Sequence, residues 1–254
     1  MKACELHGID FLSTPYSEED VRFLDRLGVH AFKLASLSVA EPYFVRYFAS
    51  FGKPLYLSTG MATLEEIHLC LNALNPSQRE LVTLLQCTSN YPTALEETNI
   101  RTISTMRNAF ELPVGYSDHT NGSVASIVAV GQGITVLEKH LTLDRSLPGP
   151  DHATSCDPGE FKSFVQEIRN AETALGSAEK KPTPSEKKHT YAMRRGLVAK
   201  KDLQKRERIE AEAIALKRPV DGIAPILYDL LIGGVLVLRR DKARDSVFTW
   251  EYFE

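Results

Sequence analysis

The stretch that decides the fold runs from Val114 to His140 and reads VGYSDHTNGSVASIVAVGQGITVLEKH. It holds two apolar runs, Val114–Tyr116 and Ile134–Leu137, and each passes directly into polar residues that end in a histidine, His119 or His140. The segment between the runs is long enough for a helix, and a strand–helix–strand unit implies parallel strands. Polar side chains at the ends of parallel strands are typical of a site at the carboxyl edge of a sheet.

The same pattern occurs four more times towards the N-terminus. Apolar runs that pass into polar clusters lie at Ile9–Leu12, Ala31–Ala35, Leu55–Leu57 and Leu81–Leu85. Helix-capping sequences begin at Ser17, Thr63 and Asp157. We therefore predict an α/β fold with a (β/α) barrel; six βα units are found where a barrel needs eight, so two N-terminal units are expected to be missing. An open doubly wound sheet is the alternative, but no G-x-G-x-x-G fingerprint supports it.

Composition argues against several classes of protein. The chain has 254 residues, of which 43% are hydrophobic and 25% are charged, as in ordinary folded proteins. No apolar run approaches the length of a membrane span, and the opening MKACELHGID lacks the apolar core of a secretory signal. The net charge of −3 argues against nucleic-acid binding. None of the four cysteines forms a C-x-x-C pair, which argues against a Cys-rich zinc site. Their scatter suits free thiols in a reducing cytoplasm better than a disulfide framework.

Composition also predicts a division of the chain. We expect a partial barrel over residues 1–176, a polar, proline-containing linker over 177–192 and a second domain over 193–254. Within the second domain, Asp202–Ile209 resembles Asp241–Phe248, which predicts a small two-fold, β-rich unit. Coincidence within a charged surface strand is the alternative. Arg218 stands at the mouth of a turn, just before Pro219.

The two histidines are the first candidates for chemistry. If His119 and His140 end neighbouring parallel strands, both imidazoles could bind one divalent cation above the barrel. The alternative is that each histidine only makes local hydrogen bonds. Ser117 and Asp118 directly precede His119 and could orient the ligands or contact a substrate, although Asp118 could equally cap a turn.

Three other residues are candidates for substrate contacts. Lys33 lies inside an apolar strand, where an unpaired ammonium is costly, so it should face either an anionic substrate or the carboxylate of Glu138. Ser58 begins the loop Ser-Thr-Gly-Met, which could bind an anion or be an ordinary turn. Asp151 lies in the rigid loop Pro-Gly-Pro-Asp-His, which could place it over the site or only connect two elements.

Taken together, the motifs resemble those of the sialic acid (N-acylneuraminate) synthase family. The motifs occur in order as FLSTPYSEEDVRFL, FKLAS, FGKPLYLSTGMATLEEI, CTSNYPT, VGYSDHT, LEKHLTLDRSLPGPDH and KKPTPSEKK. The tail RRGLVAKKDL, IALKRP and YDLLIGG resembles the family's C-terminal antifreeze-like (SAF) domain, so the resemblance covers nearly the whole chain. It implies a TIM barrel followed by a small β-clip domain, in a homodimer whose SAF domains each cover the partner's barrel mouth.

The resemblance also implies an activity. Family members condense phosphoenolpyruvate with an N-acyl hexosamine such as N-acetylmannosamine, giving a nonulosonic acid and phosphate. A divalent cation, Mn²⁺ or Mg²⁺, is held by histidines that match His119 and His140. Asp151 matches an acidic family residue on the sugar side, and Arg218 matches the arginine of the SAF domain. The residues that match family positions near phosphoenolpyruvate are Thr14, Lys33, Ser36, Ser58, Tyr91 and Ser117.

Three departures from the family pattern limit what is carried over. The family's first two strands, which bear a glutamate, a lysine and a glutamine, have no counterpart here, and Ser38 stands where a carboxylate is usual. The SAF turn has Val220 in place of a glycine, and Arg206 and Asp245 replace turn glycines, so these turns are expected to differ. We predict that the 254-residue chain alone lacks synthase activity. The alternative function is a non-catalytic remnant that binds or dimerises.

Overall fold

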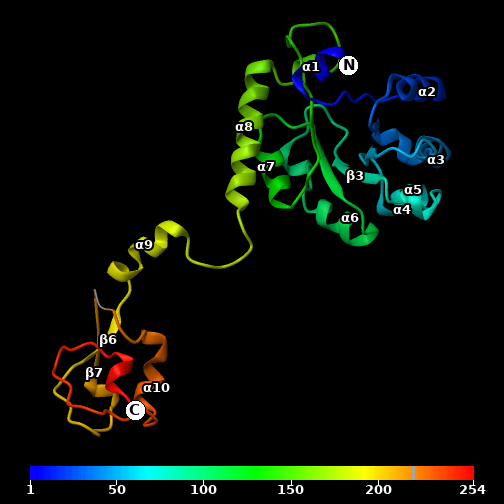
Figure 1. The fold of residues 1–254 in the computed structure, drawn as a ribbon. Helices are drawn as coiled ribbons and strands as arrows, with labels where there is room; N and C mark the ends of the chain where they lie inside the picture. Colours follow the sequence, from blue (N-terminus) through cyan, green and yellow to red (C-terminus); the bar gives the residue numbers. More distant parts are fainter. Residues whose placement is uncertain (219–220) are drawn as a thin grey trace. The chain divides into compact units, whose positions relative to one another are not determined.

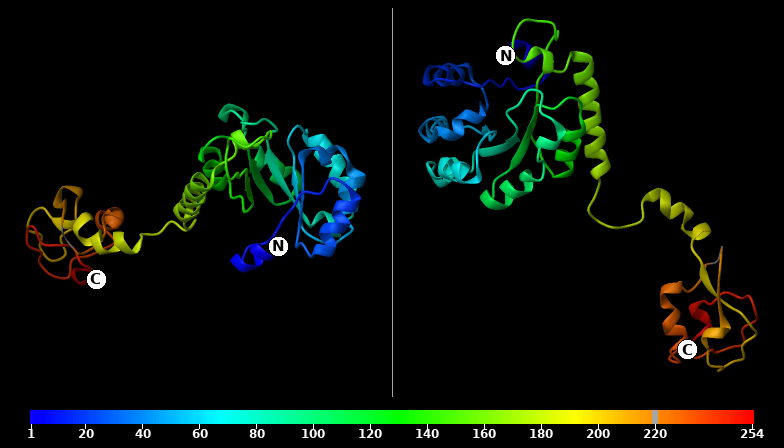
Figure 2. Two further views of the ribbon diagram at one scale, coloured as in Figure 1. Left: turned by 90° about the horizontal axis from the view of Figure 1, so that it is seen from above. Right: turned by 180° about the vertical axis from the view of Figure 1, so that it is seen from behind.

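The computed structural model describes residues 1–218 and 221–254, which form two compact units, Met1–Gly176 and Ser177–Glu254 (Figure 1). The first unit contains a sheet of five parallel strands in the order β1-β2-β3-β4-β5. The strands are β1 (Phe32–Leu34), β2 (Leu55–Ser58), β3 (Val82–Cys87), β4 (Val114–Asp118) and β5 (Leu137–Lys139). They curve into half of a barrel, which confirms the predicted α/β partial barrel (Figure 2).

Helices connect the strands of the first unit. They are α1 (Lys2–His7), α2 (Glu18–Leu27), α3 (Pro42–Ala49), α4 (Leu64–Asn72), α5 (Pro76–Arg79), α6 (Thr102–Phe110), α7 (Val124–Gly131) and α8 (Pro158–Leu175). The predicted helix starts are confirmed, because the side chains of Ser17, Thr63 and Asp157 each accept a hydrogen bond from the backbone three residues later. None of the described helices is both long and apolar enough to cross a bilayer.

The prediction of a strand at Ile9–Leu12 is wrong. This segment is irregular, and next to it only the carbonyl of Ser13 accepts a hydrogen bond, at 3.4 Å, from the backbone N–H of Lys33. A strand needs a regular ladder of such bonds, and one bond does not make a ladder. The last strand is also displaced, because β5 begins at Leu137 where the predicted run Ile134–Leu137 ends.

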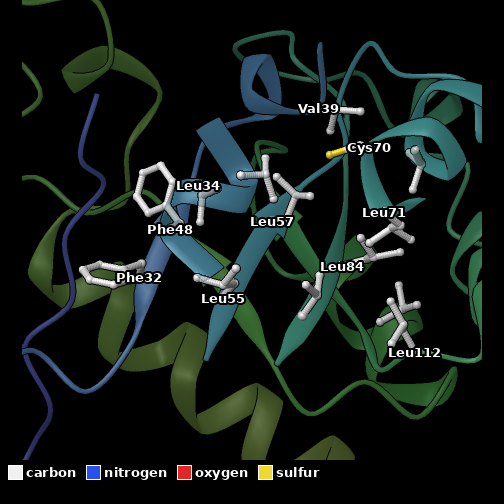
Figure 3. Close-up of a cluster of buried hydrophobic side chains, with 14 of the residues drawn as sticks. Phe32, Leu34, Val39, Phe48, Leu55, Leu57, Cys70, Leu71, Leu84 and Leu112 are labelled. Atoms are coloured by element: carbon white, nitrogen blue, oxygen red, sulfur yellow. The ribbon is translucent and has the colours of Figure 1, made fainter. Parts of the chain in front are cut away.

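Alternation along the strands separates a core from an inner face. Side chains at every second position point outwards and pack under the helices (Figure 3); they include Phe32, Leu34, Leu55, Leu57 and Leu84, all buried. Burial of each such side chain contributes about 1.5–3 kcal/mol to folding. The alternate positions, Lys33, Ser58, Ser117 and Glu138 among them, therefore point to the inner face of the half-barrel.

The second unit contains α9 (Pro184–Met193), β6 (Gly196–Ala199), β7 (Ile214–Lys217) and α10 (Tyr228–Ile232). Strands β6 and β7 pair antiparallel. All of α9 except Met193 falls in the segment 177–192, which was predicted as a linker. The internal repeat has a matching symmetry: Leu203 and Lys242 exchange two backbone hydrogen bonds of 2.8 Å. The carboxylate of Asp241 accepts from the backbone N–H of Lys205, and that of Asp202 accepts from Arg244, each at 2.7 Å.

The expectation that the turns at Arg206 and Asp245 differ from glycine-containing turns is wrong. Arg206 and Asp245 keep the left-handed conformation that glycine favours, with φ of 67° and 65°. Each is held there by a backbone hydrogen bond, from Arg206 to Leu238 at 2.8 Å and from Asp245 to Ala199 at 2.7 Å. The predicted change of turn at Val220 lies outside the described residues.

Candidate functional site

Lys33 reaches across the inner face from the middle of β1. Its Nζ donates to Ser58 Oγ at 2.8 Å and to the carbonyl of Leu34 at 2.9 Å, and it lies 3.5 Å from the carboxylate of Glu138. The residue is 6% exposed. The ion pair that we gave as the alternative to an anionic ligand is therefore present, and it joins the first strand of the sheet to the last.

Glu138 is the functional candidate that the sequence analysis missed, since it was considered only as a counter-ion. Besides facing Lys33, it accepts a hydrogen bond of 2.6 Å from Ser117 Oγ. Its side chain is 37% exposed, so the carboxylate lies at the open surface of the inner face. A signal was available: Glu138 is the first of the three polar residues that follow the apolar run Ile134–Leu137, and it pairs in register with Ser117.

The histidines come together as predicted. Their ring centroids lie 5.1 Å apart in an edge-to-face arrangement. His119 Nδ1 lies 2.8 Å from the carbonyl of Thr88, which assigns the ring proton to Nδ1 and leaves the lone pair on Nε2. That Nε2 lies 3.5 Å from Ser117 Oγ, on the inner face.

His140 and Tyr91 complete this end of the site. Burial and the neighbouring His119 lower the pKa of His140, against the opposing effect of Asp151, so its imidazole is favoured in the neutral form. Asp151 Oδ2 lies 3.9 Å from His140 Nδ1, which places the loop Pro-Gly-Pro-Asp-His beside the histidines. The ring of Tyr91 lies 4.2 Å from that of His119 and 5.5 Å from that of His140, and burial raises the pKa of its hydroxyl.

The donor set fits a divalent cation held by few protein ligands. Two imidazoles, one oriented by a backbone carbonyl, form together with water or substrate oxygens a mixed N/O donor set that can hold a divalent cation such as Mn²⁺. Within the described residues no group of three or more His, Cys, Asp or Glu side chains has the geometry of a metal site. His119 and His140 would therefore hold the cation together with water or substrate oxygens, unlike the closed four-ligand shell of a structural zinc.

The other predicted residues lie at different distances from this centre. Ser36 Oγ accepts from the backbone N–H of Gly60 at 3.0 Å and lies 3.7 Å from Cys87 Sγ, whose sulfur is 3.8 Å from His119. Thr14 is half-buried in the irregular segment before α2. Arg218 belongs to the second unit, where it is exposed and its guanidinium lies 3.5 Å from the carbonyl of Met193. The roles of all these residues in a reaction remain predictions.

Fold and site together define a (β/α)-barrel protein whose functional groups lie at the carboxyl ends of its strands. The chain belongs to the NeuB family: the family's model matches residues 1–180, and that of the SAF domain matches residues 194–254. It is thus a homologue of the nonulosonic acid synthases, and the predicted resemblance is confirmed.

Two relatives illustrate the similarity in sequence. The chain is 41% identical to the N,N'-diacetyllegionaminic acid synthase of Legionella pneumophila over 251 residues, which are 97% of this chain and 70% of that protein. It is 38% identical to the pseudaminic acid synthase of Campylobacter jejuni over 226 residues, which are 89% of this chain and 66% of that protein. The part without a counterpart here is N-terminal.

Solved structures agree on the fold. The spore coat polysaccharide biosynthesis protein spsE of Bacillus subtilis matches with a TM-score of 0.65 and 29% identity, over 100% of this chain and 75% of that one. A putative spore coat polysaccharide biosynthesis protein E of Chromobacterium violaceum matches with a TM-score of 0.82 over 98% and 75%, and at 23% identity it supports the fold alone.

Proposed function

We propose that the chain forms the metal-binding half of a nonulosonic acid synthase site. The reaction condenses phosphoenolpyruvate with an N-acyl hexosamine, such as N-acetylmannosamine, to give a sialic-acid-like acid and phosphate. The observation that carries the proposal is the row of inward side chains, from Lys33 on β1 to His140 after β5, in a chain of this family. The legionaminic and pseudaminic acid synthases to which the chain is similar support this class of reaction.

The inner face suits an anionic substrate. Phosphoenolpyruvate carries a phosphate and a carboxylate, and Lys33 with the hydroxyls of Ser58 and Ser117 would bind them. Lys33 lies 3.5 Å from Glu138, longer than a direct charge-assisted hydrogen bond. An incoming phosphate can therefore replace Glu138 as the partner of Lys33.

In the condensation, C3 of phosphoenolpyruvate forms the new bond to the aldehyde carbon of the open-chain sugar. A water oxygen adds at C2, and phosphate leaves as the C2–O bond breaks. When bound by His119 and His140, a divalent cation supplies Lewis-acid polarisation of the aldehyde oxygen. We propose that Asp151 contacts the sugar, and its position 3.9 Å from His140 supports this role.

Further parts of the proposal concern the assembly. We propose a homodimer in which Arg218 of one SAF domain reaches the site of the other protomer; the exposure of its guanidinium supports this role. All four cysteines are free, which supports function in the cytoplasm.

A second candidate function is supported by the half-open sheet. Five strands leave the inner face without the remaining strands of a closed barrel. A chain with this face open could bind a ligand or dimerise without turning over substrate. The two candidates make opposite predictions once the barrel is completed.

The test is phosphate release from phosphoenolpyruvate and N-acetylmannosamine with Mn²⁺, alongside sugars of the legionaminic and pseudaminic acid pathways. We expect no turnover by the 254-residue chain, because the family's first two strands and their glutamate are absent. A chimera that adds the N-terminal segment of the Legionella synthase should release phosphate, and His119→Ala in that chimera should abolish release.

The Legionella synthase, assayed in parallel, is the positive control. A folded chimera that stays inactive while the parent turns over would contradict the proposed synthase and favour the non-catalytic function. Turnover by the 254-residue chain alone would contradict the need for the missing strands.

A further inference from the structure

The ends of β4 and β5 meet in successive pairs of side chains. The register pairs Ser117 with Glu138 and then Asp118 with Lys139, and a histidine follows on each strand. Because side chains alternate between the faces of a sheet, the first pair points inwards and the second points outwards, towards the helices. The pair Asp118–Lys139, called the outer pair below, therefore lies behind the site and not within it.

The outer pair is a buried ion pair. Asp118 is 1% exposed, the side chain of Lys139 is 4% exposed, and their charged atoms lie 3.0 Å apart. Ser126 of α7 donates a hydrogen bond of 2.5 Å to Asp118 Oδ2, the same oxygen that faces Lys139. The ring of Phe164 of α8 lies 5.4 Å from Lys139 Nζ. Two helices thus enclose the pair in surroundings where the attraction between its charges is strong.

Both members of the outer pair also hold the backbone around His119. Lys139 Nζ donates to the carbonyl of Thr120 at 2.5 Å and to that of Gly122 at 3.1 Å. Asp118 Oδ1 accepts from the backbone N–H of Thr120 at 2.8 Å. The chain is therefore tied to β5 both before and after His119.

The outer pair is the last link between the two strands before the histidines. The paired register ends at Asp118 and Lys139. Beyond it the strands bond to other neighbours: the carbonyl of His119 accepts from Thr93 at 2.9 Å, and that of His140 accepts from Cys156 at 3.0 Å. The separation of the two imidazoles thus depends on the outer pair, which is the last residue pair in the register of β4 and β5.

We propose that Asp118 and Lys139 are positioning residues that set the separation of the two imidazoles and hence the affinity of the metal site. The inference rests on the proposed function, because it presupposes that His119 and His140 bind the cation. Two metal ligands tolerate only small displacements from their productive geometry. Disrupting the outer pair should therefore weaken metal binding without removing a ligand.

The test is Mn²⁺ affinity of the 254-residue chain by titration calorimetry, with the Co²⁺ absorption spectrum as a readout of ligand geometry. Asp118→Asn and Lys139→Gln should each weaken Mn²⁺ binding about tenfold or more. The double variant should recover part of the loss, because an asparagine and a glutamine can form a neutral hydrogen-bonded pair at the same positions. Its Co²⁺ spectrum should return towards that of the wild type.

Leu71→Ala is the matched control, since Leu71 is buried on α4, which connects β2 to β3 and carries no residue of the outer pair. It should destabilise the same unit by about 3 kcal/mol and leave Mn²⁺ affinity unchanged. If a single variant of the outer pair fails to fold, Ser126→Ala removes one hydrogen bond to Asp118 and should still weaken Mn²⁺ binding severalfold.

The outcomes separate this inference from the proposed function. Folded variants of the outer pair with wild-type Mn²⁺ affinity overturn the positioning role while leaving the metal site intact. An equal loss in Leu71→Ala also overturns it, because the effect would then be general destabilisation. A wild-type chain whose Mn²⁺ affinity is unchanged by His119→Ala overturns the metal site itself, and the inference with it.

Discussion

Lys139 and Lys242 are both buried lysines, and the two units of the molecule accommodate them differently. In the first unit, the ammonium of Lys139 faces the carboxylate of Asp118 at 3.0 Å. In the second unit, Lys242 is 1% exposed, and its ammonium lies 2.5 Å from the carbonyl of Val247 and 3.6 Å from the ring centroid of Tyr252. One cation is paired with an anion, whereas the other is surrounded by a carbonyl and aromatic rings.

The difference has an electrostatic consequence. Burial and, to a lesser extent, the nearby Arg240 lower the pKa of Lys242 to about 8, against the opposing effect of Glu251. Lys242 is therefore costly to keep charged, and its main contribution is to fill the core of the repeat. Lys139 instead joins two strands through a directional ion pair. The comparison shows that a buried lysine links two strands only where it forms an ion pair with a carboxylate.

The largest expected effect is the loss of the ion pair in the first unit. Lys139→Met leaves Asp118 buried without its counter-charge, so the unit should lose about 3–5 kcal/mol of stability. Denaturant unfolding followed by far-UV circular dichroism measures this loss. Lys53→Met, which breaks the more exposed Lys53–Asp25 pair, should cost at most about 1 kcal/mol. Equal losses in the two variants would show that the outer pair is no stronger than a surface pair.

A smaller and opposite effect is expected in the second unit. The unfolded chain binds a proton at Lys242 up to about pH 10.5, whereas the folded chain releases it above about pH 8. The contribution of Lys242 to stability should therefore rise with pH between these two values, by roughly 3 kcal/mol. Below about pH 8 this contribution should be constant and at its lowest. Fluorescence of Trp250, the single tryptophan, reports unfolding of this unit.

Lys242→Met is the matched control for this pH dependence. Because methionine does not titrate, the variant should show no such rise, and at pH 7 it should be no less stable than the wild type. Lys139→Met makes the same substitution at a lysine that is paired with a carboxylate. The difference in stability loss between the two variants directly compares a paired with an unpaired buried lysine. Parallel pH profiles for the wild type and Lys242→Met would contradict the lowered pKa.

Local patterns predicted most of the fold, and pairing between strands accounts for what they missed. The starts of α2, α4 and α8 were predictable because a capping residue and its partner lie three positions apart in the chain. The segment Ile9–Leu12 has a strand-like sequence, but strand formation depends on a neighbour that local sequence does not reveal. In the same way, the positions of the two histidines at strand ends were predictable from the local sequence. The contacts of Glu138 and Lys139 follow instead from the register between β4 and β5.

The smallest expected effect lies in the turns of the repeat. A left-handed conformation costs a non-glycine residue about 1–2 kcal/mol, and glycine gives back part of this through its greater freedom in the unfolded chain. Arg206→Gly should therefore stabilise the second unit by about 0.5–1 kcal/mol. Thermal unfolding followed by the fluorescence of Trp250 measures this gain. Asp245→Gly relieves the same backbone cost but loses the ion pairs of Asp245 with Lys217 and Arg244, so its gain should be smaller. A destabilised Arg206→Gly would mean that the arginine side chain contributes more than the backbone conformation costs, and the two halves of the repeat would then differ in what holds their turns.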